Sequence, residues 1–171
     1  MDRIRNSITQ NSRFNHLSDT RKESLASLVE FIAEVQKKCV VYGHGLWNTE
    51  DAKSILGRGL FTPRGDLSEL AHPLRTPEQG LAEQITLWPY HGANHIVLIA
   101  IPRIAAEVGE RPNVMPEEVF EAAEPPSDLP YRIKFPPEYN KRVPPSKIIG
   151  YWNNDESKFH RSPVWQESDE G

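Results

Sequence analysis

The run His95-Ile96-Val97-Leu98-Ile99-Ala100-Ile101 is the most apolar segment of the chain. Gly92 precedes this run and Pro102 follows it, so its length suits a strand better than a helix. Apolar residues fill consecutive positions, as expected for a strand that is covered on both faces. The sequence therefore predicts a buried central strand here.

Helices and short strands alternate on the N-terminal side of this run. Each expected helix opens with capping residues and continues with apolar residues at helical spacing. The first one opens with Thr20 and Glu23, which form the T-x-x-E pattern of a capping box. In chain order we expect a helix over 20–37, a strand over 39–42, a helix that begins at Asn48 or Thr49 and ends in the left-handed conformation at Gly57 or Gly59, and a helix from Thr76 to about residue 87.

A proline-rich excursion follows the central run. Ten of the 15 prolines lie within 102–145, and proline cannot occupy a central strand because it lacks the N–H group. We expect mostly irregular chain there, with a short helix at about 116–123 and an edge strand around 131–135. A last strand is expected over 146–152.

The length of 171 residues fits one domain. We expect a loose N-terminal segment over 1–17, a single globular domain over 18–152 and a flexible acidic tail over 153–171. Because the strands are short and the helices few, the pattern favours an α+β fold with a small mixed or antiparallel sheet over a doubly wound sheet.

Composition excludes several classes of protein. We expect no signal peptide and no membrane span, because the N-terminus lacks an apolar core and no apolar run is long enough. The single cysteine, Cys39, excludes a disulfide framework within the chain, and the cytoplasm is the expected location. The formal net charge of −4 argues against bulk nucleic-acid binding, although a local basic patch stays possible. The oligomeric state is left open.

The segment Tyr42-Gly43-His44-Gly45-Leu46 is the first candidate site. Glycines at a strand end let a ligand approach the backbone closely, and a neutral imidazole both donates and accepts hydrogen bonds. The same residues also fit a plain turn with a histidine on the surface.

With the pattern A-x-x-I-L-x-x-G-L over 52–60, this segment resembles the ADP-ribosyltransferase-like fold. The phrase over 142–149 is similar, more loosely, to a late element of that superfamily. The resemblance implies that NAD is bound, that His44 contacts its nicotinamide ribose and that Gly45 lies beside the nicotinamide. Arg58 or Arg64 would then clamp a phosphate with two parallel hydrogen bonds.

The resemblance also implies catalysis by stabilising an oxocarbenium-like ribosyl centre, which requires an acidic group nearby. Glu138 and Glu156 are the candidate acids. Tyr90 is the nearest candidate for the middle motif of the superfamily, and its ring would stack on a ligand ring.

Two further histidines, His91 and His95, follow Tyr90. Either could act as a general acid or base. A metal site would need them on one helix face, which Gly92 prevents, so no metal is expected. Equally, Trp88 and Tyr90 could cover the edge of the core while both histidines face water.

Three functions therefore stay open. The first is a mono-ADP-ribosyltransferase-like protein that binds NAD through His44. The second is a non-enzymatic module whose proline-rich loop, extended by Pro-Pro pairs, and acidic tail meet a protein partner. The third is a histidine-dependent enzyme acting on RNA or another phosphoester through His44, His91 and His95.

Overall fold

The computed structural model describes residues 2–46, 48–61, 71–87, 93–102, 139 and 141–165. The helix expected at about 116–123 and the edge strand expected around 131–135 lie outside these residues. Within them the chain forms an α+β domain, as the sequence predicts.

One five-stranded antiparallel sheet organises the domain, with strand order β3-β1-β4-β6-β7. The predicted central run is β4, which lies in the middle of this order and is buried from His95 to Ile101. A separate two-stranded sheet joins β2 to β5. The strands are β1 (Cys39–Leu46), β2 (Leu60–Phe61), β3 (His72–Pro73), β4 (His95–Pro102), β5 (Arg142–Val143), β6 (Ile148–Asn153) and β7 (Lys158–Arg161).

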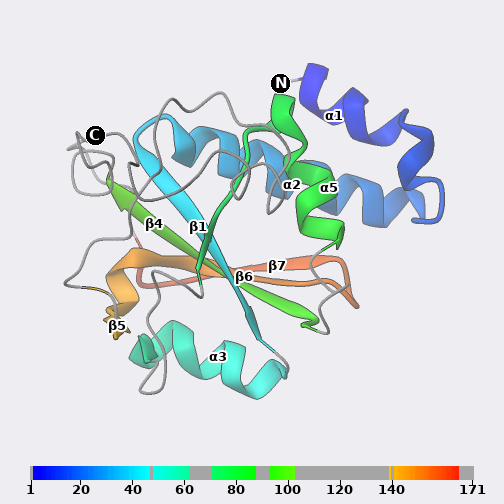
Figure 1. Cartoon of the computed structure of the whole chain (residues 1–171). Coiled ribbons are helices and arrows are strands. Elements are labelled where there is room, and N and C mark those ends of the chain that lie inside the picture. Colours follow the sequence, from blue (N-terminus) through cyan, green and yellow to red (C-terminus); the bar gives the residue numbers. More distant parts are fainter. Residues whose placement is uncertain are drawn as a thin grey trace, which may run out of the picture.

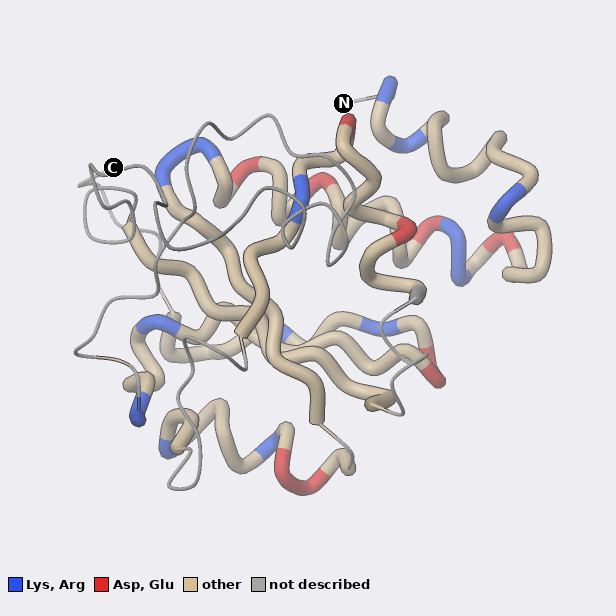
Figure 2. The backbone as a smooth tube through the Cα atoms, viewed as in Figure 1, with Lys and Arg blue, Asp and Glu red and all other residues tan. Residues whose placement is uncertain are grey.

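Helices cover both faces of the large sheet (Figure 1). On one face lie α1 (Asp2–Thr9), α2 (Asp19–Gln36) and α5 (Leu81–Leu87), and on the other lies α3 (Thr49–Arg58). The central strand β4 carries no Lys, Arg, Asp or Glu, whereas the helices and the edge strand β7 do (Figure 2). The sheet is therefore the apolar middle layer of a three-layer arrangement.

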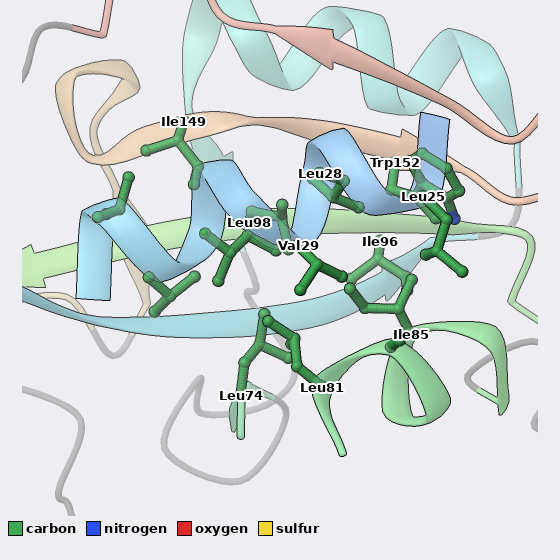
Figure 3. Close-up of a cluster of buried hydrophobic side chains, with 14 of the residues drawn as sticks. Leu25, Leu28, Val29, Leu74, Leu81, Ile85, Ile96, Leu98, Ile149 and Trp152 are labelled. Atoms are coloured by element: carbon green, nitrogen blue, oxygen red, sulfur yellow. The ribbon is translucent and has the colours of Figure 1, made fainter. Parts of the chain in front are cut away.

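The α2 face holds the larger core (Figure 3). The apolar stripe of α2 predicted from its helical spacing packs onto alternate residues of β4 and onto Ile149 and Trp152 of β6, and α5 closes one side. The residues drawn and labelled there are Leu25, Leu28, Val29, Leu74, Leu81, Ile85, Ile96, Leu98, Ile149 and Trp152. Alternation along β4 sends the intervening residues to the α3 face. In β6 an irregularity in the pairing with Leu98 and Ile99 places Ile148 and Tyr151 on that face.

The α3 face holds a second cluster, in which Ala52 and Ile55 of α3 contact the sheet. Tyr42 of β1, Val97 of β4 and Tyr151 of β6 belong to this cluster and are buried. Among the described candidate site residues, His44 and His95 point to this face, because they lie two residues along the strand from Tyr42 of β1 and Val97 of β4, respectively.

The N-terminal segment is not loose as expected. It forms α1 and a 3₁₀ turn over Ser12–Phe14, and Ile8 and Phe14 are buried in the α2-face core. Arg5 links α1 to α2 through ion pairs with Glu23 and Glu30. Isolated helices this short are marginal in water, so contacts with α2 rather than local propensity hold α1.

The expectation of a flexible tail after residue 153 is also wrong for its first part. Residues Lys158–Arg161 form β7, which pairs with β6. Trp165 is buried against Phe31 of α2, and the Arg161 guanidinium lies 5.0 Å from the Phe31 ring centroid and 5.5 Å from that of Trp165. Residues 166–171 lie outside the described part.

Several boundaries differ from the predictions. Ser18, not Thr20, caps α2, because its side chain accepts the N–H of Arg21. Of the two candidates Asn48 and Thr49, Asn48 caps α3, and the helix ends at Gly59 with φ +91° and ψ 175°, which is not the left-handed conformation. The start predicted at Thr76 opens a 3₁₀ turn rather than α5, and the last strand begins at Ile148 after a 3₁₀ turn over Pro145–Lys147.

Candidate functional site

His44 lies within β1, not at its end. The strand was expected to end at Tyr42 but continues to Leu46, because the Gly-His-Gly segment pairs with β4. His44 is opposite Val97, and alternation places its side chain on the α3 face with those of Tyr42 and Leu46. The imidazole is partly exposed there.

The peptide group of Gly45 points in a different direction from the His44 side chain. The N–H of Leu74 donates to the carbonyl of Val41 at 2.8 Å, and Gly43 is opposite His72 of β3. In an antiparallel pair every second residue turns its N–H and C=O to the same edge, so Gly45 faces the β3 edge as well. Among the described residues, β3 pairs with β1 no further than Gly43.

One row of side chains crosses the α3 face from strand to strand. The register places His44 opposite Val97, Val97 opposite Tyr151 and Tyr151 opposite His160. Val97 and Tyr151 are buried beneath α3, and the two histidines at the ends are partly exposed. Three strand spacings, about 14 Å, separate the ends of this row.

His95 does not face water, which was one of the expectations. It is only 4% exposed, and its Nε2 lies 2.9 Å from the hydroxyl of Thr49 in the first turn of α3. Its ring centroid is 6.0 Å from that of Tyr151. The ring is therefore closed to bulk water in this structure, and its role as a general acid or base stays a prediction.

Tyr151 is 1% exposed and stacks on His160, with ring centroids 4.5 Å apart. Burial, and secondarily the negative charge of Glu156, raise the pKa of Tyr151 above its ordinary value of 10.0. The phenol therefore stays protonated at neutral pH and keeps its hydrogen-bond donor.

Asn153 organises the turn between β6 and β7. It is 5% exposed, and its Oδ1 accepts the N–H groups of Asp155 at 3.0 Å and Glu156 at 3.2 Å. Its Nδ2 donates to Glu156 Oε1 at 2.8 Å, and His160 Nε2 lies 3.6 Å from the same oxygen. The carboxylate of Glu156 is thus held beside His160, at the end of the row remote from His44.

The remaining predicted site residues are dispersed or not described. Arg58 is exposed in the last turn of α3. Tyr90, His91, Arg64 and Glu138 lie outside the described residues, so their roles stay predictions. In the part of the chain that the structure describes, no three His, Cys, Asp or Glu side chains gather as a metal site would require.

Sequence reasoning missed Tyr151, Asn153 and His160 as site residues. The turn-forming run Asn153-Asn154-Asp155, placed between two segments with aromatic residues, is a hairpin pattern that could have revealed β7. Assigning that run to a flexible tail concealed it.

No family model, curated protein or solved structure matches the chain. None of the helices within the described ranges is both long enough and apolar enough to cross a membrane.

Proposed function

We propose that this protein binds NAD at the β3 edge of β1 and belongs functionally with mono-ADP-ribosyltransferase-like proteins. The observation that carries the proposal is the geometry of two adjacent residues. The side chain of His44 points to the α3 face while the peptide group of Gly45 points to the sheet edge beside it. The sequence resemblance around Tyr42–Leu60 supports NAD as the ligand.

The peptide of Gly45 offers one donor and one acceptor side by side. A primary carboxamide such as that of nicotinamide presents the complementary pair, one C=O and one NH₂. The His44 imidazole, one residue away, would hydrogen-bond a hydroxyl of the attached ribose. Because neither contact needs an ionised protein group, binding of this part of NAD is expected to depend weakly on salt.

Transfer would break the glycosidic bond between nicotinamide and ribose and leave positive charge on the ribosyl ring, which an acid must stabilise. Glu156 is separated from His44 by nearly the whole row, since it lies beside His160. We therefore assign Glu156 no role on a ribose held by His44. Glu138 keeps that role as a prediction.

The position of Glu156 favours a second candidate, a module that binds NAD without transfer, which is distinct from the module expected to meet a protein partner through the proline-rich loop. The two candidates differ in one product, because only transfer or hydrolysis releases nicotinamide from NAD. Chromatographic detection of free nicotinamide during incubation with the full chain, lost in Glu138→Gln, supports transfer. Stable binding with intact NAD supports the module.

The first experiment is thermal unfolding with and without millimolar NAD. A ligand at 100 times its dissociation constant adds about 2.7 kcal/mol, which raises the melting temperature by about 5–10 °C in a protein of this size. We expect this shift in the wild type and in His16→Ala, an exposed histidine of the N-terminal segment. We expect its loss in His44→Ala.

A shift that persists in His44→Ala would remove His44 from the site. No shift in any of the three proteins at millimolar NAD would contradict the proposal.

A further inference from the structure

Three buried polar atoms on the α3 face have no hydrogen-bond partner among the described residues, and one of them, Nε2 of His160, lies 3.6 Å from a carboxylate oxygen of Glu156. The other two are Nδ1 of His95 and the hydroxyl of Tyr151. The two side chains come from the neighbouring strands β4 and β6, and their ring centroids are 6.0 Å apart. Buried polar groups are nearly always paired, and those without a protein partner usually hold a water or another bound group.

Each of the two side chains is restrained by one further contact. Thr49 holds the other ring nitrogen of His95 at 2.9 Å. His160 lies flat against the ring of Tyr151, with an angle of 13° between the planes. The two unpartnered atoms are therefore held in place before any guest arrives, which lowers the entropic cost of binding one.

The groups around the two polar atoms favour binding of a neutral molecule over a charged one. An imidazole nitrogen and a phenol hydroxyl together donate and accept, which is also what an alcohol or water does. A charged guest would lose its hydration without a buried countercharge to replace it, because the nearby carboxylate of Glu156 is 58% exposed.

The unpartnered atoms of His95 and Tyr151 lie on the same face of the sheet as the side chain of His44. His95 is opposite Leu46, two residues along β1 from His44, and both side chains point to the α3 face. Residues in such a diagonal relationship have Cα atoms about 7–8 Å apart. A sugar hydroxyl of a ligand beside His44 is thus close to this pair.

We propose that His95 and Tyr151 form a subsite for one neutral hydroxyl group, supplied either by an ordered water or by a sugar of the bound ligand. The sugar source rests on the proposed function, and the water source does not. In either case the hydroxyl of Tyr151 makes the contact, and phenylalanine would fill the same volume without making it.

The test compares Tyr151→Phe with Tyr42→Phe, a matched change at another buried tyrosine of the same cluster. Melting temperature is measured without ligand, and affinity is measured by calorimetry for NAD, ADP-ribose and nicotinamide. A crystal structure of the ligand-free full chain, at a resolution that shows ordered water, completes the set.

A sugar source predicts that Tyr151→Phe raises the melting temperature without ligand by about 3 °C, because an unpaired buried hydroxyl is removed. It also predicts about fivefold weaker binding of NAD and ADP-ribose, with nicotinamide, which has no sugar, unaffected. A water source predicts density bonded to both atoms, a lower melting temperature in Tyr151→Phe and unchanged affinities.

The proposal is overturned if the crystal structure shows no water between the two atoms and Tyr151→Phe weakens NAD and ADP-ribose no more than Tyr42→Phe does. If the wild type binds no NAD, the proposed function fails separately. The density between His95 and Tyr151 then decides the hydroxyl subsite by itself.

Discussion

The rings of Tyr151 and His160 stack face to face across β6 and β7, with centroids 4.5 Å apart and planes inclined by 13°. This contact joins the buried interior of the α3 face to the partly exposed edge strand. It also brings Tyr151 within the influence of Glu156, which lies 3.6 Å from the Nε2 of His160. The hairpin therefore couples a core residue to a surface charge.

Alkaline pH should destabilise the protein through Tyr151. Burial and Glu156 raise the pKa of Tyr151 in the folded protein above 10.0. Above about pH 10 the unfolded chain releases this proton while the folded protein retains it, so stability present below that pH is lost as pH rises. The free energy of unfolding, measured in urea between about pH 9 and 11, should fall less steeply with rising pH in Tyr151→Phe than in the wild type. If the free energy of unfolding falls equally in both proteins, groups other than Tyr151 cause the loss of stability at alkaline pH.

Gly150 is required for the approach of β7 to β6. It has φ +150°, and a Cβ there would overlap the carbonyl oxygen of His160 and the ring of Phe159. Gly150→Ala should cost about 2 kcal/mol or more in the free energy of unfolding. Gly57→Ala is the matched control, because nothing lies within 4 Å of its added Cβ. In helix α3 this change should stabilise by about 0.5–1 kcal/mol, and a similar cost at both glycines would contradict the argument.

Trp165 should anchor the C-terminal segment to α2. It is buried in the α2-face core and meets Phe31 edge to face. Trp165→Ala should cost about 3–5 kcal/mol, as large-to-small changes of buried aromatic residues do. The neighbouring Val164 is 51% exposed, so Val164→Ala should change stability by less than about 0.5 kcal/mol. Denaturant unfolding measures both, and a neutral Trp165→Ala would show that the segment detaches in solution.

Carboxamide recognition by Gly45 should discriminate nicotinamide from nicotinic acid. The carboxylate of nicotinic acid has no N–H to donate to the Gly45 carbonyl and would place negative charge against that oxygen. We expect nicotinamide to bind at least about tenfold more tightly in a calorimetric titration. Equal affinities for nicotinamide and nicotinic acid would mean that the Gly45 peptide does not hydrogen-bond the carboxamide, whether or not His44 contacts the ribose.

The sequence by itself determined the elements whose cause is local. Seven consecutive residues with almost no polar side chain specify the central strand β4, and apolar spacing specifies the inner face of α2. Asn48 identifies the start of α3 because its side chain satisfies a backbone N–H only three residues away. His44 became a candidate site residue in the same way, from its flanking glycines and the helix pattern that follows.

Only the tertiary structure decided where the chain pairs with distant parts of itself. Short segments such as α1 and β7 carry too few apolar residues to be recognised alone, and each is held by a partner, α2 or β6. The burial of His95 beneath α3 and its proximity to Tyr151 depend on the register between β4 and β6, which no local pattern encodes. The spacing of residue types along the chain reflects interactions between sequence neighbours. Contacts between strands depend on how the whole sheet packs.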